Sequence, residues 1–132
     1  MDQAIVTTPL DARTFTNSLV IFDDTDTLPD KNIREKLEHL KFDLIETWRK
    51  QSVYVCISSH MATGKSRIIN ECMGICFFPA SSATNGIEYI LKKKYSIPNS
   101  IYQKVIKLPS RYVMFRRSYP QCFIYDKGIF LT

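Results

Sequence analysis

The chain has 132 residues, of which 45% are hydrophobic and 23% are charged, and its net charge is +5. This composition predicts one compact domain and excludes a disordered or fibrous protein. The apolar runs are far shorter than the ~20 residues of a membrane-spanning helix, and the first ten residues lack a basic leader, so we expect neither a membrane span nor a secretory signal.

The charge is divided unevenly along the chain. Residues 1–48 contain ten acidic and five basic side chains, whereas residues 49–132 contain three acidic and thirteen basic ones. No acid lies between Tyr89 and Tyr125, although this segment contains eight basic residues. Such a block attracts phosphate groups. The alternative is a solvated surface that only keeps the protein soluble.

Hydrophobic periodicity predicts the first strand and the first helix. Residues 18–23 form a short, continuously apolar run, which is typical of a strand buried on both faces. A helix is predicted from Pro29, where the missing N–H costs nothing, with Thr27 or Asp26 as its cap. Its apolar side chains recur every three or four residues as far as Trp48, which we assign to the core.

Strands and helices then alternate. Residues 53–57 are a β-branched run that predicts a second buried strand. A helix is expected from Ser66 to Met73, ended by Gly74, and a third strand over residues 75–78. The alternation predicts a parallel sheet of the βαβ type.

The end of the chain has a different character. Two short basic helices are predicted over residues 86–94 and 98–107, the second capped by Ser96. They are followed by short strands with turn residues between them, which predict an antiparallel hairpin at the edge of the parallel sheet. These strands are expected over residues 111–115, 121–125 and 129–131.

Two aspartates end the first predicted strand. The apolar run followed by Asp23 and Asp24 has the form of the Walker B element of P-loop NTPases. A buried parallel strand places its last residue in the crevice where ligands bind in such folds. There Asp23 can hold Mg²⁺ through water, and Asp24 can orient and deprotonate the attacking water.

Polar residues also end the second predicted strand, where Ser58, Ser59 and His60 follow the apolar run. The succession LVIFDDTDTL, TWRK, VYVCISSH and NECMGICFFP resembles the C-terminal half of the viral DNA-packaging ATPases related to HerA and FtsK. The later stretches GIEYILKKKY, LPSRYVMF and YPQCFIYDKGIFL resemble the tail of the same proteins. The resemblance covers residues 15–131.

The resemblance implies a fold, a chemistry and partners. The fold would be α/β, a partial P-loop NTPase with three layers (αβα), parallel strands and a C-terminal antiparallel hairpin. The single domain, residues 1–132, would comprise the Walker B strand, a sensor strand and a basic C-terminal part over residues 18–24, 53–60 and 86–132. Asp23 would be the metal ligand and Asp24 the catalytic carboxylate, while Ser59 or His60 would sense the γ-phosphate.

The implied activity is ATP-driven packaging or translocation of DNA. ATP and Mg²⁺ would be the cofactors and DNA the partner. The protein would assemble into a homo-oligomeric ring or bind a partner that bears the Walker A loop. Its location would be the cytoplasm of a host cell or a virion, with no membrane association.

The phosphate-binding loop is the main departure from this family. Residues 1–18 contain no glycine or lysine, so no Gly-rich loop precedes the Asp-Asp strand in this sequence. Residues 59–66 are the one candidate, with Gly64, Lys65 and Ser66 in the correct places but Ser59 where the first glycine belongs. In this alternative the chain is a small nucleotide-binding protein. We prefer the sensor interpretation, which explains the aspartates and the tail together, and we expect the chain alone not to hydrolyse ATP.

A further alternative is a non-enzymatic protein that binds nucleic acid through residues 89–119. Tyr95, Tyr102 or Tyr112 would then stack on bases of a single strand. Candidate phosphate contacts are Lys92, Lys93, Lys94, Arg116 and Arg117. Either of the two arginines is also a candidate arginine finger.

The four cysteines, Cys56, Cys72, Cys76 and Cys122, match no common zinc spacing. We expect them to be reduced and buried, and to behave as small apolar residues.

Overall fold

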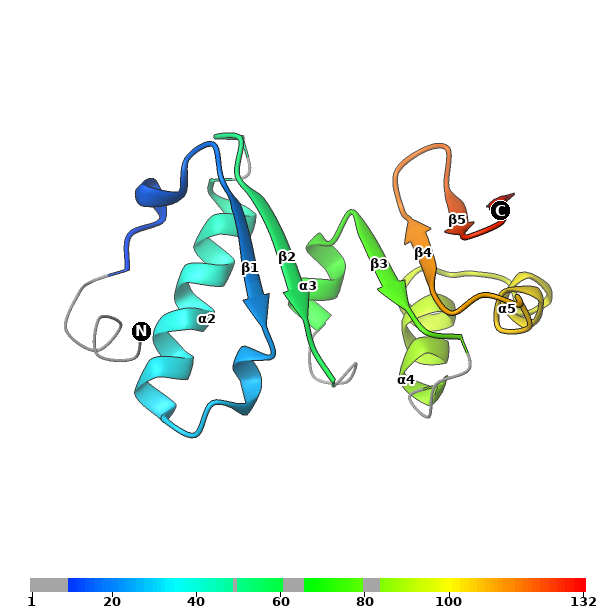
Figure 1. Ribbon diagram of the computed structural model, residues 1–132, viewed down its shortest axis with the longest axis horizontal. Helices are drawn as coiled ribbons and strands as arrows, with labels where there is room; N and C mark the ends of the chain where they lie inside the picture. Colours follow the sequence, from blue (N-terminus) through cyan, green and yellow to red (C-terminus); the bar gives the residue numbers. More distant parts are fainter. Residues whose placement is uncertain (1–9, 49, 61–65, 80–83) are drawn as a thin grey trace. The chain divides into compact units, whose positions relative to one another are not determined.

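The computed structural model describes residues 10–48, 50–60, 66–79 and 84–132. The chain divides into two compact units, residues 1–60 and residues 61–132, and each contains a hydrophobic cluster. The first unit contains a two-stranded parallel sheet and the second a four-stranded antiparallel sheet, both accompanied by helices (Figure 1). The protein is therefore a mixed α/β protein. No helix in the described ranges has the length and apolar character needed to cross a membrane.

Two parallel strands form the sheet of the first unit. β1 (Leu19–Asp23) pairs with β2 (Tyr54–Ser58), in a register that runs from Leu19 opposite Tyr54 to Asp23 opposite Ser58. Both strands come from apolar, largely β-branched or aromatic runs that favour extended backbone. The prediction of two adjacent parallel strands is confirmed. The prediction that they are buried on both faces is wrong, because alternate side chains, among them Leu19, Ile21 and Tyr54, are exposed. Their carboxyl ends therefore lie at the same edge of the sheet.

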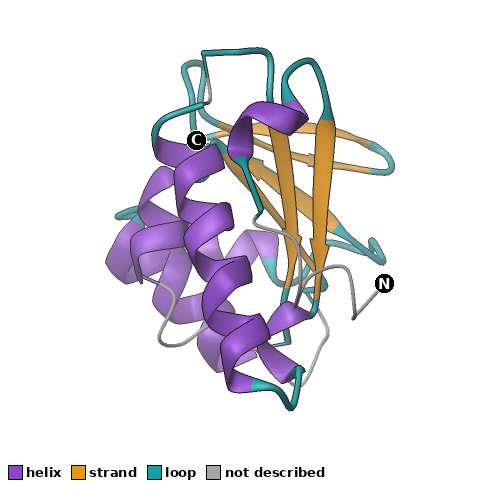
Figure 2. Cartoon of the chain, turned by 90° about the vertical axis from the view of Figure 1, so that its left-hand side faces the viewer, coloured by secondary structure: helices purple, strands orange, loops and turns teal. Residues whose placement is uncertain are grey.

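Helix α2 (Lys31–Glu46) lies along one face of these strands, as Figures 1 and 2 show. Phe22 of β1 and Val53 share a buried cluster with Leu40 and Leu44 of the helix. This burial explains the apolar stripe of the helix, since Leu37, Leu40 and Leu44 all pack in the cluster that includes side chains of the strands. Short 3₁₀ turns, η1 (Ala12–Phe15) and η2 (Thr25–Thr27), flank β1.

The predicted start of α2 is wrong in detail. Asp30 is the N-cap, and its side chain accepts a hydrogen bond from the N–H of Ile33 at 3.1 Å. Pro29 therefore precedes the cap, and neither Thr27 nor Asp26 caps the helix, because both belong to the separate turn η2. The helix ends at Glu46. Trp48 accordingly lies beyond it, partly buried against the same core.

The second unit contains an antiparallel sheet with the strand order β3-β4-β5-β6. The prediction of a third parallel strand is wrong, because β3 (Gly74–Phe77) pairs antiparallel with β4 (Val113–Arg116). The predicted hairpin is confirmed as β5 (Cys122–Tyr125) and β6 (Gly128–Leu131), but it belongs to this separate sheet.

Gly74 begins β3 and does not end a helix, since α3 (Ser66–Glu71) stops three residues earlier. The position requires glycine because the chain passes very close to the neighbouring strand. A Cβ atom on Gly74 would lie 2.9 Å from the carbonyl oxygen of Phe115. Glycine is therefore needed here because two strands approach closely, and not because a helix ends at this residue.

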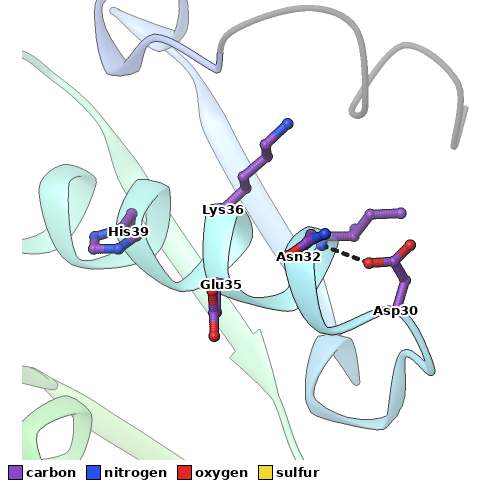
Figure 3. Close-up of a pocket in the computed structure, with 6 residues that line it drawn as sticks. Asp30, Asn32, Glu35, Lys36 and His39 are labelled. Carbon is purple, nitrogen blue, oxygen red and sulfur yellow. Dashed lines mark hydrogen bonds between the residues drawn. The ribbon is translucent and has the colours of Figure 1, made fainter.

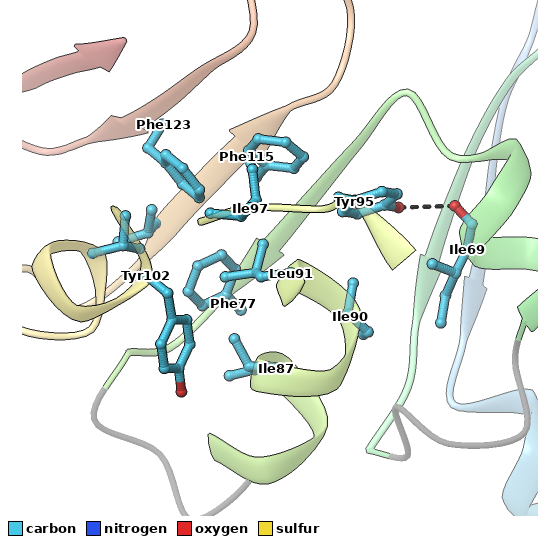
Figure 4. Close-up of a cluster of buried hydrophobic side chains, with 12 residues drawn as sticks. Ile69, Phe77, Ile87, Ile90, Leu91, Tyr95, Ile97, Tyr102, Phe115 and Phe123 are labelled. Carbon is cyan, nitrogen blue, oxygen red and sulfur yellow. Dashed lines mark hydrogen bonds between the residues drawn. The ribbon is translucent and has the colours of Figure 1, made fainter. Parts of the chain in front are cut away.

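Three helical segments cover one face of the antiparallel sheet. They are α4 (Thr84–Glu88), the π-helix η3 (Tyr89–Lys94) and α5 (Asn99–Val105). Their apolar side chains pack against those of the strands in the cluster drawn in Figure 4. Pro98, and not the predicted Ser96, is the N-cap of α5. The basic part of the chain is thus held on an apolar core of its own.

Candidate functional site

The carboxyl ends of β1 and β2 bring polar side chains from both strands together. The hydroxyl of Ser58 donates a hydrogen bond to the carboxylate of Asp23. The backbone N–H of Asp24 donates to the carbonyl oxygen of Ser58 and to its Oγ, at 3.2 Å in each case. The predicted meeting of the aspartates with the polar end of the second strand is therefore observed.

The chain turns sharply at Asp24, whose backbone is left-handed with φ 49° and ψ 37°. Aspartate tolerates this conformation better than most residues do. Thr27 stabilises the turn, because its hydroxyl lies 2.9 Å from the carbonyl oxygen of Asp24 and 3.4 Å from its Oδ2. The same Oδ2 lies 3.4 Å from Nε2 of the exposed His60. Asp24 and His60 thus face each other across the strand ends.

Ser59 is directed at a third carboxylate. Its hydroxyl donates to Oδ2 of Asp26 at 3.1 Å, and Oδ1 of Asp26 lies 3.9 Å from Nζ of Lys41. Lys41 is fully buried, and it also contacts Glu38 at 2.6 Å and the Thr25 hydroxyl at 3.2 Å. A buried cation therefore connects α2 to the turn that follows β1.

Asp26 and Lys41 also belong to this site, although neither is a predicted site residue, and Ser58 was predicted only as a polar residue at the strand end. A signal for Lys41 was present, because it lies four residues after Leu37 and therefore on the apolar face of α2. A lysine buried at such a position requires carboxylates that pair with its ammonium group, because burial of an unpaired charge is costly. No comparable signal distinguished Asp26 from an ordinary helix cap.

The chemistry of these groups suits a metal–phosphate ligand better than a free metal ion. The described part of the chain contains no group of three or more His, Cys, Asp or Glu side chains that could hold a metal ion. Mg²⁺ commonly binds through one or two carboxylates together with water and substrate phosphates. Asp23 and Asp24 fit this second kind of site.

A hollow of about 340 Å³ lies on the exposed side of α2 (Figure 3). None of the strand-end residues lines it. The hollow is therefore separate from the candidate site. Its lining residues are Asp30, Asn32, Ile33, Glu35, Lys36 and His39.

The alternative phosphate loop over residues 59–66 is described only at its two ends. Lys65 lies outside the described residues, and Ser66 is the first residue of α3, a helix of six residues. Ser59 and His60 belong to the strand-end site described above.

The candidate lysines of η3 differ in their surroundings. Lys92 contacts Glu88 at 2.6 Å, and its Nζ lies 4.6 Å from the centre of the Tyr102 ring. Lys94 lies 5.8 Å from the Tyr89 ring, whereas Lys93 is exposed. The basic segment lacks internal acids, but Glu88 immediately before it partly neutralises it.

The two candidate arginines also differ. The guanidinium of Arg117 donates to the carbonyl oxygen of Asn70 and lies 5.2 Å from the centre of the Tyr95 ring. Arg116 is exposed, and its Nε donates to the Ser118 hydroxyl at 2.9 Å. Both arginines are exposed, but the guanidinium of Arg117 contacts Asn70 and the Tyr95 ring, whereas Arg116 contacts the neighbouring Ser118.

The expectation that Tyr95 and Tyr102 stack on bases is wrong, because both rings are buried in the core. The Tyr95 hydroxyl donates to the carbonyl oxygen of Ile69 at 2.8 Å (Figure 4), and burial raises the pKa of Tyr95 to about 12. Tyr112 is exposed and remains compatible with stacking.

The cysteines only partly follow the expectation. All four are free thiols, and Cys122 is buried as expected. Cys56 and Cys76 are exposed, however, because alternation along β2 and β3 directs them away from the core face. Burial raises the pKa of the half-buried Cys72.

Comparisons with known proteins give limited but specific information. The chain is similar to the uncharacterized protein V3 of the Sputnik virophage, with 31% identity over 121 residues. This relative is a viral protein. The match covers 88% of this chain and 49% of the V3 protein, so the chain spans about half the length of the relative. No family model and no solved structure matches.

Proposed function

We propose that this chain is the Walker B half of a viral ATP-driven DNA-packaging or DNA-translocating ATPase. The supporting observation is the meeting of Asp23, Asp24 and His60 at the carboxyl ends of two adjacent parallel strands. In the proposed enzyme a phosphate-binding segment completes a three-layer αβα fold, and the assembly is a homo-oligomeric ring or includes a Walker A-bearing partner.

Each strand-end residue has a role in the proposed reaction. Asp23, whose orientation is fixed by the hydrogen bond from Ser58, would hold the hydrated Mg²⁺ of Mg-ATP, and the ion would supply neutralisation of charge on the phosphates. Asp24 orients the attacking water and accepts its proton, and either His60, 3.4 Å away from Asp24, or Ser59 senses the γ-phosphate.

Exposed apolar side chains on one face of the parallel sheet support the proposed completion. Leu19, Ile21 and Tyr54 are 63%, 63% and 69% exposed, and they share the face opposite α2. Parallel sheets are normally covered on both faces because their strands are apolar on both sides. A second layer of polypeptide on this face accounts for the apolar side chains, and we assign it to the phosphate-binding segment.

The charge of the second unit supports DNA as the partner. Residues 61–132 contain eleven basic and three acidic side chains, whereas residues 1–60 contain seven basic and ten acidic ones. Such a surface attracts nucleic acid without sequence preference, as a motor that moves along DNA requires. The same observation favours the second candidate function, a nucleic-acid-binding protein without enzymatic activity.

Phosphate release with Mg-ATP, measured with and without DNA, tests the proposal. We expect the purified 132-residue chain to be inactive, because it lacks the loop that neutralises and positions the β- and γ-phosphates. Addition of a Walker A-bearing polypeptide should produce turnover. Turnover by the chain alone that disappears in Lys65→Ala would instead identify residues 59–66 as the phosphate loop.

A further inference from the structure

The loop that connects β4 to β5, residues 117–121, presents an aromatic ring to solvent. Tyr119 is 94% exposed. A tyrosine usually contributes to folding by burying its ring and pairing its hydroxyl. Tyr119 contributes almost no buried area in this structure, so its ring is available to a ligand.

Hydrogen bonds hold both ends of this loop. On the β4 side, the backbone N–H of Arg117 donates to the carbonyl oxygen of Met73 at 2.9 Å, and its guanidinium donates to Asn70. On the β5 side, the Thr132 hydroxyl donates to the carbonyl oxygen of Gln121 at 3.2 Å. An anchored loop loses less conformational entropy on binding than a free one. The exposed ring is therefore carried by a loop whose two ends are fixed to the rest of the second unit.

A cation lies three residues before the ring, at the end of β4 from which the loop begins. Arg116 is exposed, and its Nε donates a hydrogen bond to the Ser118 hydroxyl at 2.9 Å, a bond that does not use the terminal guanidinium nitrogens. Arginine donors of this kind bind phosphate oxygens with two parallel hydrogen bonds. No acidic residue occurs between Tyr89 and Tyr125, so the segment that contains this loop carries only positive charge.

We propose that the β4–β5 loop is a contact site for single-stranded DNA, in which the Tyr119 ring stacks on a base and Arg116 binds an adjacent phosphate. The proposal deepens the proposed function and depends on it for DNA as the partner. A single strand is the ligand because its bases have free faces, whereas the bases of a duplex are already stacked on both sides. Tyr119 takes the stacking role that was predicted for Tyr95 and Tyr102, because the rings of those two residues are in the core.

Fluorescence anisotropy of a labelled oligothymidylate, titrated with the 132-residue chain at several salt concentrations, tests this site. Tyr119→Ala should weaken binding about fivefold or more, as expected for loss of one stacked base. The slope of log affinity against log salt should not change, because no phosphate contact is lost. Arg116→Gln should reduce that slope by about 0.7, the value for one phosphate contact on a single strand.

Two further variants serve as controls. Tyr119→Phe retains the ring and should bind like the wild type. Tyr54→Ala removes an exposed tyrosine from the acidic first unit and should leave binding unchanged. A labelled duplex of the same length should show little difference between the wild type and Tyr119→Ala.

Two results would overturn the proposal. In the first, Tyr119→Ala binds the oligonucleotide as tightly as the wild type does. This result would show that the chain binds DNA at a site other than the β4–β5 loop. The other is the absence of any binding by the wild-type chain. Neither decides the ATPase proposal, because ATP turnover by the completed assembly is measured independently.

Discussion

The hydroxyl of Ser58 donates a hydrogen bond to the carboxylate of Asp23, and the two residues are register partners at the carboxyl ends of β2 and β1. This bond joins the strand that precedes Asp24 to the strand that precedes Ser59 and His60. A shift of the register by one residue would turn Ser58 to the opposite face of the sheet. The geometry of the proposed site therefore depends on the parallel pairing.

Asp24→Asn should abolish ATP turnover by the completed assembly while nucleotide binding is retained. The amide has nearly the shape of the carboxylate but cannot accept the proton of the attacking water. Phosphate release and equilibrium binding of a fluorescent nucleotide measure the two effects separately. Retention of more than about a tenth of the wild-type rate would contradict the role of Asp24, since general-base catalysis contributes on the order of a hundredfold or more.

Ile21→Lys should prevent completion of the enzyme without unfolding the chain. Ile21 is exposed on one face of the parallel sheet, so a lysine there contacts water in the isolated chain and apolar surface in the assembly. Urea unfolding should change by no more than about 0.5 kcal/mol, as for other exposed positions. Co-purification with the Walker A-bearing polypeptide should be lost, and normal co-purification would show that this face is not the interface.

Lys41→Met should destabilise the first unit, although methionine retains most of the apolar stem. The change removes the buried cation next to Glu38 and Asp26, and we expect a loss of about 1–3 kcal/mol in the free energy of unfolding. Urea denaturation followed by circular dichroism measures this loss. Lys36→Met, at an exposed position on the same helix, is the control. Equal stability of Lys41→Met and the control would show that the ion pairs do not stabilise the turn.

Lys93→Glu should weaken DNA binding without loss of stability, because Lys93 is exposed. Lys92→Glu should weaken binding and also destabilise the second unit, since it places a carboxylate beside Glu88. Binding and unfolding measured on both variants distinguish the two effects. The triple change of Lys92, Lys93 and Lys94 to Glu should reduce affinity about equally for every DNA sequence. Unchanged affinity would show that this block only keeps the protein soluble.

Tyr95 should make the second unit lose stability at high pH. Burial raises its pKa to about 12, Cys72 adds to the increase and Arg117 opposes it. The unfolded tyrosine has a pKa of about 10, so the folded state holds the proton more tightly. The resulting stabilisation is complete below pH 10 and is lost as the pH rises towards 12.

Tyr95→Phe should remove this pH dependence. At neutral pH it should cost about 1 kcal/mol, because the carbonyl oxygen of Ile69 loses its hydrogen bond. Urea unfolding of both proteins over the alkaline range measures the difference. Parallel pH profiles for the two proteins would contradict the assignment to Tyr95.

Local pattern was sufficient for several elements. The apolar runs predicted β1 and β2, the spacing of leucines predicted α2, and the turn residues before Gly128 predicted the β5–β6 hairpin. The meeting of Asp24 with His60 also followed from the sequence, because a crossover helix between two adjacent strands makes them parallel and brings their carboxyl ends together. Each of these features depends on residues close in sequence or on one general rule of chain connection.

Only the tertiary structure decided the partner of β3, the burial of Tyr95 and the role of Lys41. An apolar strand pairs equally well in either direction, and β3 finds its partner in β4, which is distant in sequence. A tyrosine next to lysines has the same local pattern whether its ring is buried or stacks on a base. Long-range packing determines which side chains lose their contact with water, and no local pattern of residues contains that information.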